Sequence, residues 1–121
     1  MSSSKRIVAI VDDDIRLLES LENLLESAGY AVRTFASAKA LLAAGLSDLG
    51  CLITDIGMPE MDGFQLLDAV RDTRPDLAIL MMTGRHEIAD QPARAAMATA
   101  LFRKPIDGRL LLAAIEKSFV V

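Results

Sequence analysis

The sequence has 121 residues, the size of one ordinary domain, and its hydrophobic content of 52% is enough to build a core. A formal net charge of −4 lacks the excess of Lys and Arg that nucleic-acid binding requires. One cysteine cannot form an internal disulfide, and the polar start and short apolar runs exclude a signal peptide and a membrane span. We therefore expect a soluble, cytoplasmic single domain that binds neither nucleic acid nor membrane directly.

The first half of the chain alternates between two hydrophobic periods. Residues 7–11 form a continuous, mostly β-branched run, which is typical of a strand buried on both faces. Residues 14–29 then carry leucines at helical spacing, with glutamates mostly elsewhere. Residues 30–35 predict a second strand, and residues 37–45 a short helix that Ser37 is suited to cap.

The second half continues this alternation. Strands are predicted at residues 51–54, 77–82 and 100–103, and helices at about 64–70, 92–97 and 107–119. Because short links join strands that alternate with helices, the chain predicts an α/β fold with five βα units and a mostly parallel sheet.

Four of the five predicted strands end in polar side chains. In an open α/β sheet, ligands bind beyond the carboxyl ends of the strands, so these residues are expected to meet at one edge. They are Asp12, Asp13 and Asp14 after the first strand, Asp55 after the third, Thr83 and Gly84 after the fourth, and Lys104 after the fifth.

This set has the parts of a phosphoryl-transfer site. Crowded carboxylates repel each other, and a hard divalent cation such as Mg²⁺ relieves that repulsion with oxygen ligands alone. Lys104 and the Thr83 hydroxyl are suited to hold phosphoryl oxygens, and an ionised aspartate acts as a nucleophile without a general base.

Taken singly, the same residues have simpler interpretations. The three aspartates at 12–14 are also what a helix N-terminus favours, and Asp55, Thr83 or Lys104 alone would pass for ordinary strand-end residues. His86 has no second metal ligand at a suitable spacing, and Cys51 is expected in the core. The joint placement at four strand ends is what points to a site.

Four motifs stand at the ends of the predicted strands: Val11-Asp12-Asp13-Asp14, Thr54-Asp55-Ile56-Gly57-Met58-Pro59, Met82-Thr83-Gly84 and Arg103-Lys104-Pro105. Together they resemble the receiver domain of bacterial two-component response regulators, and the third-strand motif resembles its FixJ-like group. The resemblance covers about residues 5–119 and implies a flavodoxin-like five-stranded sheet of order 2-1-3-4-5, with no output domain within residues 1–121.

The resemblance implies a role for each site residue. Asp55 is the implied phosphoacceptor, with Thr83 and Lys104 acting on the phosphoryl group. The implied Mg²⁺ (or Mn²⁺) ligands are Asp12, directly or through water, Asp13, Asp55 and the backbone carbonyl of Gly57. The donor is a histidine kinase, a phosphotransfer protein or a small acyl phosphate. Such a domain is not an enzyme beyond its own phosphorylation and dephosphorylation, and it switches partner binding.

Two departures from the family pattern concern the read-out. Leu101 stands where the family usually has Tyr or Phe, and Phe102 points to the opposite face because side chains alternate along a strand. The fourth helix is short, since Pro92 belongs in a first helical turn. Both changes fall on the face of the fourth helix, fifth strand and fifth helix that receivers commonly use to dimerise.

Two alternatives stay open at this stage. The first is a pseudo-receiver, which keeps the fold as an interaction module without phosphorylation. The second is a phosphohydrolase of the haloacid-dehalogenase type, because Asp12 and Asp14 form an Asp-x-Asp after the first strand. The sequence names no kinase, signal, output partner or oligomeric state.

Overall fold

The computed structural model describes residues 7–84, 93 and 96–119. Its strands and helices alternate up to residue 83, as the hydrophobic periods predict, and the two remaining elements of the described residues are a strand and a helix. In order, they are β1 (Ile7–Val11), α1 (Ile15–Ser27), β2 (Ala31–Phe35), α2 (Ala38–Ala44), β3 (Cys51–Asp55), α3 (Gly63–Thr73), β4 (Ala78–Thr83), β5 (Ala100–Arg103) and α6 (Gly108–Ser118).

The five strands form one parallel sheet in the order β2-β1-β3-β4-β5, which confirms the predicted fold class and strand order. The strands β1 and β3 lie inside the sheet and every one of their residues is buried. Their continuous apolar runs follow from this position, because helices cover both faces of a parallel sheet.

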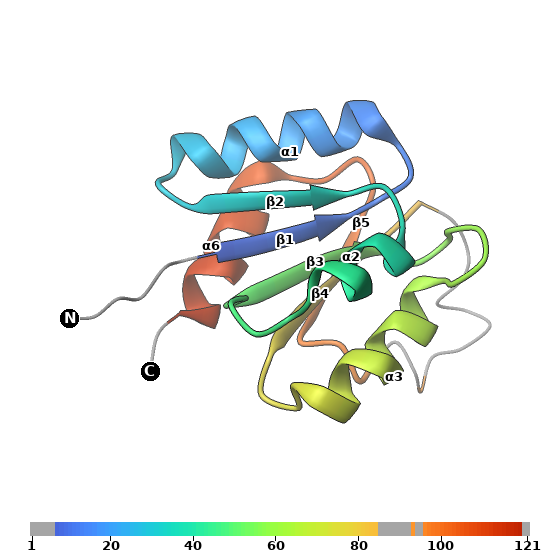
Figure 1. Cartoon of the computed structure of the whole chain (residues 1–121). Coiled ribbons are helices and arrows are strands. Elements are labelled where there is room, and N and C mark those ends of the chain that lie inside the picture. Colours follow the sequence, from blue (N-terminus) through green and yellow to red (C-terminus); the bar gives the residue numbers. More distant parts are fainter. Residues whose placement is uncertain (1–6, 85–92, 94–95, 120–121) are drawn as a thin grey trace.

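Helices cover the two faces of the sheet in pairs (Figure 1): α1 and α6 lie on one face, α2 and α3 on the other. Side chains of β1 alternate between them. Ala9 and Val11 pack with Leu41 of α2 and Leu67 of α3, whereas Val8 and Ile10 pack in the cluster of α1 and α6. The domain thus has two hydrophobic cores, one on each face of the sheet.

Three side chains lie on the sides of the sheet, or in the core, as the sequence predicts. Leu101 packs in the α2–α3 core and Phe102 in the α1–α6 core, so the two face opposite sides of the sheet as expected. Cys51 is fully buried, and burial raises the pKa of its thiol to about 11. None of the helices in the described ranges has the length and apolar composition of a membrane span.

The predicted element ends are accurate to within one to a few residues. The largest difference is at the end of α3, which spans Gly63–Thr73 where residues 64–70 were predicted. Its start is fixed by a capping box of Asp62 and Gln65. β4 begins one residue later than predicted and includes Thr83. The helix predicted at about 92–97 lies largely outside the described residues, and Ala96 and Met97 form a turn.

Candidate functional site

Four strand ends bring polar side chains to one edge of the sheet. Because the strands are parallel, their carboxyl ends lie together (Figure 1). Asp12 directly follows β1, Asp55 and Thr83 end β3 and β4, and Lys104 directly follows β5. The buried polar residues in the described ranges are Asp12, Thr54, Asp55 and Thr83. Polar groups in an interior require partners, so a site, rather than chance, explains this concentration.

Lys104 joins two of the carboxylates. Its Nζ lies 2.9 Å from Oδ2 of Asp12 and 3.2 Å from Oδ1 of Asp55. Burial lowers the pKa of Lys104, but the hydrogen bond to Asp12 and the charges of both carboxylates outweigh it, so the net effect raises that pKa. The ammonium group therefore stays charged at neutral pH.

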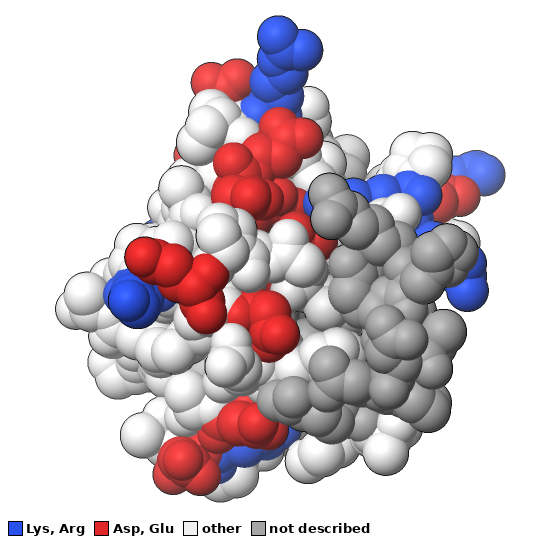
Figure 2. Space-filling model, turned by 90° about the vertical axis from the view of Figure 1, so that its right-hand side faces the viewer, with Lys and Arg blue, Asp and Glu red and all other residues white. Residues whose placement is uncertain are grey.

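Three aspartates gather their oxygens at this edge. One carboxylate oxygen from each of Asp12, Asp13 and Asp55 lies within 4.8 Å of the others, and Asp13 is the exposed member. The pocket that they border has a volume of about 280 Å³ and is lined by Asp12, Asp13, Asp14, Asp55, Gly57, Gly84 and Lys104. Figure 2 looks onto this side of the molecule and shows acidic side chains in several patches among white residues.

Asp55 carries the most perturbed carboxylate of the site. Its pKa is raised from the ordinary 3.8 to about 6, first by burial and then by the negative charge of Asp12. Lys104 opposes this rise, and Asp13 adds a smaller like-charge contribution. At neutral pH the Asp55 carboxylate is therefore mostly ionised, but Lys104 compensates its negative charge only in part.

Asp12 and Asp14, which follow β1, have different surroundings. Oδ1 of Asp12 accepts a hydrogen bond from the Asp14 amide at 2.9 Å while Oδ2 faces Lys104, so both oxygens of Asp12 are engaged. The side chain of Asp14 instead caps α1 by accepting from the amides of Arg16 and Leu17. The simpler interpretation of Asp14 as a helix cap is thus correct.

Thr83 and Gly57 lie at the margins of the pocket. Thr83 is buried at the end of β4, directly before the pocket residue Gly84, and its carbonyl accepts from the Lys104 amide at 2.8 Å. Gly57 is exposed, two residues after Asp55, and lines the pocket. The structure therefore places Asp12, Asp13, Asp55, Gly57 and Lys104 on one pocket, and the backbone of Thr83 next to it.

Sequence reasoning missed the part that Gly63 plays in closing the loop after β3. The Gly63 amide donates to the Ile56 carbonyl at 2.8 Å, so the loop returns to the residue that follows Asp55. The Asp62-Gly63 pair indicates a turn in the sequence, but a turn signal does not tell which backbone the glycine approaches.

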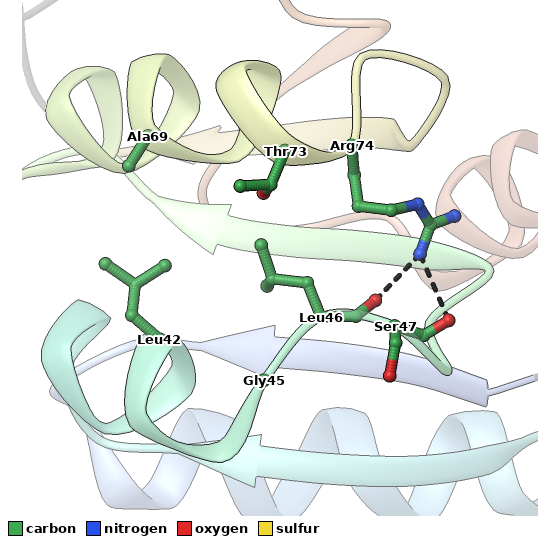
Figure 3. A pocket seen from close by; sticks show the side chains of 7 residues that line it. All are labelled: Leu42, Gly45, Leu46, Ser47, Ala69, Thr73 and Arg74. Atoms are coloured by element: carbon green, nitrogen blue, oxygen red, sulfur yellow. Dashed lines mark hydrogen bonds between the residues drawn. The ribbon is translucent and has the colours of Figure 1, made fainter.

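A second pocket lies between α2 and α3, and it shares no lining residue with the acidic one (Figure 3). It has a volume of about 380 Å³ and apolar walls that include Leu42, Leu46 and Ala69. At one end, Arg74 donates to the carbonyls of Leu46 and Ser47 at 2.7 and 3.4 Å. Because this guanidinium holds the chain after α2 in place, we interpret the pocket as a packing feature.

Comparisons with known proteins agree with the fold. The sequence model of the response regulator receiver domain matches residues 8–116, so the chain belongs to this family of two-component signalling domains. Its FixJ-like character is confirmed by a relative from Azorhizobium caulinodans, the transcriptional regulatory protein FixJ, which is 37% identical over 113 residues. That alignment covers 92% of this chain and 54% of the relative.

Other relatives give the same picture. The response regulator protein TodT of Pseudomonas putida is 35% identical over 118 residues, covering 96% of this chain and 52% of TodT. The chain thus spans about half the length of the curated relatives it matches. Among solved structures, full-length FixJ from B. japonicum superposes with a TM-score of 0.84 at 34% identity, covering 96% of this chain and 58% of that one. A CheY-like receiver domain protein from Methanospirillum hungatei reaches 0.85 at 33% identity, covering 94% and 93%.

Proposed function

We propose that Asp55 is the phosphoacceptor of this receiver domain and that its phosphorylation switches protein–protein interaction or dimerisation. The donor is the phosphohistidine of a histidine kinase or phosphotransfer protein, or a small acyl phosphate. One observation carries this proposal: the Asp55 carboxylate borders an open acidic pocket, with Lys104 Nζ at 3.2 Å and the Asp12 and Asp13 carboxylates beside it.

The chemistry follows from the protonation states of these groups. An ionised Asp55 oxygen attacks phosphorus, the bond from phosphorus to the donor atom breaks, and an acyl phosphate remains on Asp55. With a pKa of about 6, Asp55 is mostly ionised at neutral pH and needs no general base. Lys104 stays charged and lies close enough to compensate the negative charge of the phosphoryl oxygens.

The donor atoms suit a hard divalent cation. Three carboxylate oxygens within 4.8 Å of one another, with no nitrogen or sulfur ligand among them, are the kind of set that Mg²⁺ or Mn²⁺ prefers. Asp12, Asp13, Asp55 and the carbonyl of Gly57 would hold the ion. When bound, it supplies positive charge that relieves the carboxylate repulsion and orders the phosphoryl oxygens.

A second candidate is the pseudo-receiver, in which the fold binds a partner without phosphorylation. Leu101 favours it, because this side chain lacks the aromatic ring that the family usually moves when the switch hydroxyl responds, and Phe102 packs on the other face of the sheet. In that case Thr83 would carry no signal. The intact acidic pocket argues for retained phosphorylation, with a read-out that differs from the usual one.

The phosphohydrolase alternative has less support. The Asp14 side chain is committed to the cap of α1. The second aspartate of the Asp-x-Asp pattern is therefore placed for a structural role rather than for acid catalysis.

Addition of beryllofluoride with Mg²⁺, an analogue of the phosphoryl group, tests the proposal. We expect the backbone ¹⁵N NMR signals around Asp55 and Thr83 to shift in the wild type and to stay in place in Asp55→Asn. Asp72→Asn, which changes an exposed carboxylate on α3, is the matched control and should respond like the wild type. Shifts at Asp55 without any at Thr83 would favour a phosphorylated site with another read-out, and no shifts at all would favour the pseudo-receiver.

A further inference from the structure

Gly63, the first residue of α3, lies against the backbone that carries Asp55. A Cβ atom on Gly63 would lie 2.4 Å from the carbonyl oxygen of Asp55 and 2.8 Å from the Cα of Ile56. Both are backbone atoms, so no side-chain rotation makes room for a methyl group. Among the described glycines, Gly29 and Gly45 have left-handed φ values, and Gly63 does not. A glycine is needed at position 63 because there is no room for a side chain, and not because of the backbone conformation.

The same glycine closes the loop that follows β3. The carbonyl of Ile56 accepts hydrogen bonds from the amides of Gly63 at 2.8 Å and Met58 at 3.1 Å. The loop 56–62 therefore begins and ends at one backbone position. Gly57 lies inside this loop and lines the acidic pocket, so its position depends on how tightly the loop closes.

We propose that Gly63 is a positioning residue for the acidic site, an inference that rests on the proposed function. The missing side chain lets α3 start directly on the backbone of Asp55, and this contact holds the Gly57 carbonyl at a set place relative to the Asp55 carboxylate. An added methyl group must move either the start of α3 or the loop, and both movements displace Gly57 from the pocket.

Gly63→Ala tests this proposal before any phosphate is present. Without metal, we expect the Gly57 amide signal in ¹⁵N NMR spectra to move. With Mg²⁺ alone, we expect binding to weaken on the order of tenfold or more, because misplacing a group by about 1 Å has effects of that size. Phosphoryl incorporation from acetyl phosphate should fall by a similar factor.

Gly108 offers a matched control on the other face of the sheet. Both glycines are the first residue of an 11-residue helix that an aspartate caps, Asp62 for α3 and Asp107 for α6. A Cβ on Gly108 would meet the end of the flexible Leu24 side chain at 3.1 Å, and among the described residues outside its own helix turn no backbone atom lies within 4 Å of it. Gly108→Ala should therefore leave Mg²⁺ affinity and the Gly57 signal unchanged.

Asp62→Ala separates positioning from a general loss of α3 stability. It removes the cap of the same helix but puts nothing between Gly63 and the Asp55 backbone. We expect it to lower the midpoint of urea unfolding while Mg²⁺ affinity stays close to that of the wild type. If it weakens Mg²⁺ binding as much as Gly63→Ala does, the effect belongs to helix stability and the proposal is wrong.

The proposal is also wrong if Gly63→Ala folds, binds Mg²⁺ like the wild type and leaves the Gly57 signal in place. If this variant does not fold, hydrogen exchange on the wild type decides. The Gly63 amide should then exchange at least tenfold more slowly than the Gly57 amide without metal, and equal rates would contradict a closed loop.

A wild type that binds Mg²⁺ but takes no phosphate refutes the proposed function and leaves these tests of Gly63 intact.

Discussion

Asp55 is held in the protein with a charge that its surroundings only partly compensate. Burial and the neighbouring Asp12 raise its pKa to about 6, although Lys104 lies within ion-pair distance. A carboxylate with a folded-state pKa above its unfolded value disfavours folding once it is ionised. The proposed phosphoacceptor is therefore expected to reduce the stability of the metal-free protein.

Asp55→Asn should consequently stabilise the metal-free protein at pH 7.5. A rise in pKa from 3.8 to about 6 corresponds to about 3 kcal/mol. Because Lys104 loses one of its two partners, we expect a gain of about 1–3 kcal/mol in the free energy of unfolding. The folded state binds the proton more tightly, so the gain is full above about pH 6 and shrinks towards pH 4.

Urea unfolding with EDTA present measures this gain, and the exposed Asp72→Asn is the comparison. A variant at position 55 that is less stable than the wild type at pH 7.5 would show that the ion pair with Lys104 outweighs the burial of the charge. The account of the Asp55 pKa would then be incorrect.

At the scale of single elements, the two aspartates that precede α1 have different surroundings. The Asp14 side chain accepts from two amides of the first helical turn, whereas an oxygen of Asp13 lies with those of Asp12 and Asp55. Capping side chains satisfy amides that otherwise have no partner in the helix. We therefore infer that the run of three aspartates serves two purposes, a helix cap at Asp14 and the proposed metal site at Asp12 and Asp13.

Substitution should distinguish these two purposes. Asp14→Ala should lower the free energy of unfolding by about 1 kcal/mol and change Mg²⁺ affinity little, whereas Asp14→Asn keeps an acceptor and should restore most of the loss. Asp13→Ala should leave stability nearly unchanged and lower Mg²⁺ affinity strongly. Urea unfolding and an NMR titration with Mg²⁺ provide both readings. A larger Mg²⁺ effect from Asp14→Ala than from Asp13→Ala would reverse the assignment.

At the scale of the whole molecule, the alternation of hydrophobic periods was sufficient to predict the fold class, an α/β fold with a mostly parallel sheet. Residues 7–11 and 51–53 are apolar at consecutive positions, and the structure buries both runs inside the sheet. A parallel topology then fixes one edge for all carboxyl ends, which is why residues as distant as Asp12 and Lys104 could be predicted to meet. The strand order itself came from the family resemblance.

Other features depend on contacts between distant parts of the chain, which a local sequence pattern does not predict. The sequence does not reveal that Lys104 lies between Asp12 and Asp55, because side-chain reach depends on where the chain turns after β5. It does not reveal that Gly63 touches the Asp55 backbone, because a turn signal describes the local chain and not its neighbours. The extent of β4 also exceeded the apolar run, since its ladder with β5 includes Thr83.

The most direct test of the central claim is mass spectrometry of the intact protein after treatment with acetyl phosphate and Mg²⁺. The account predicts one added phosphoryl group on the wild type, its absence when Mg²⁺ is replaced by EDTA, and its absence in Asp55→Asn. A wild type that gains no phosphoryl mass, or an Asp55→Asn variant that gains it at the wild-type rate, would contradict the assignment of Asp55 as the phosphoacceptor.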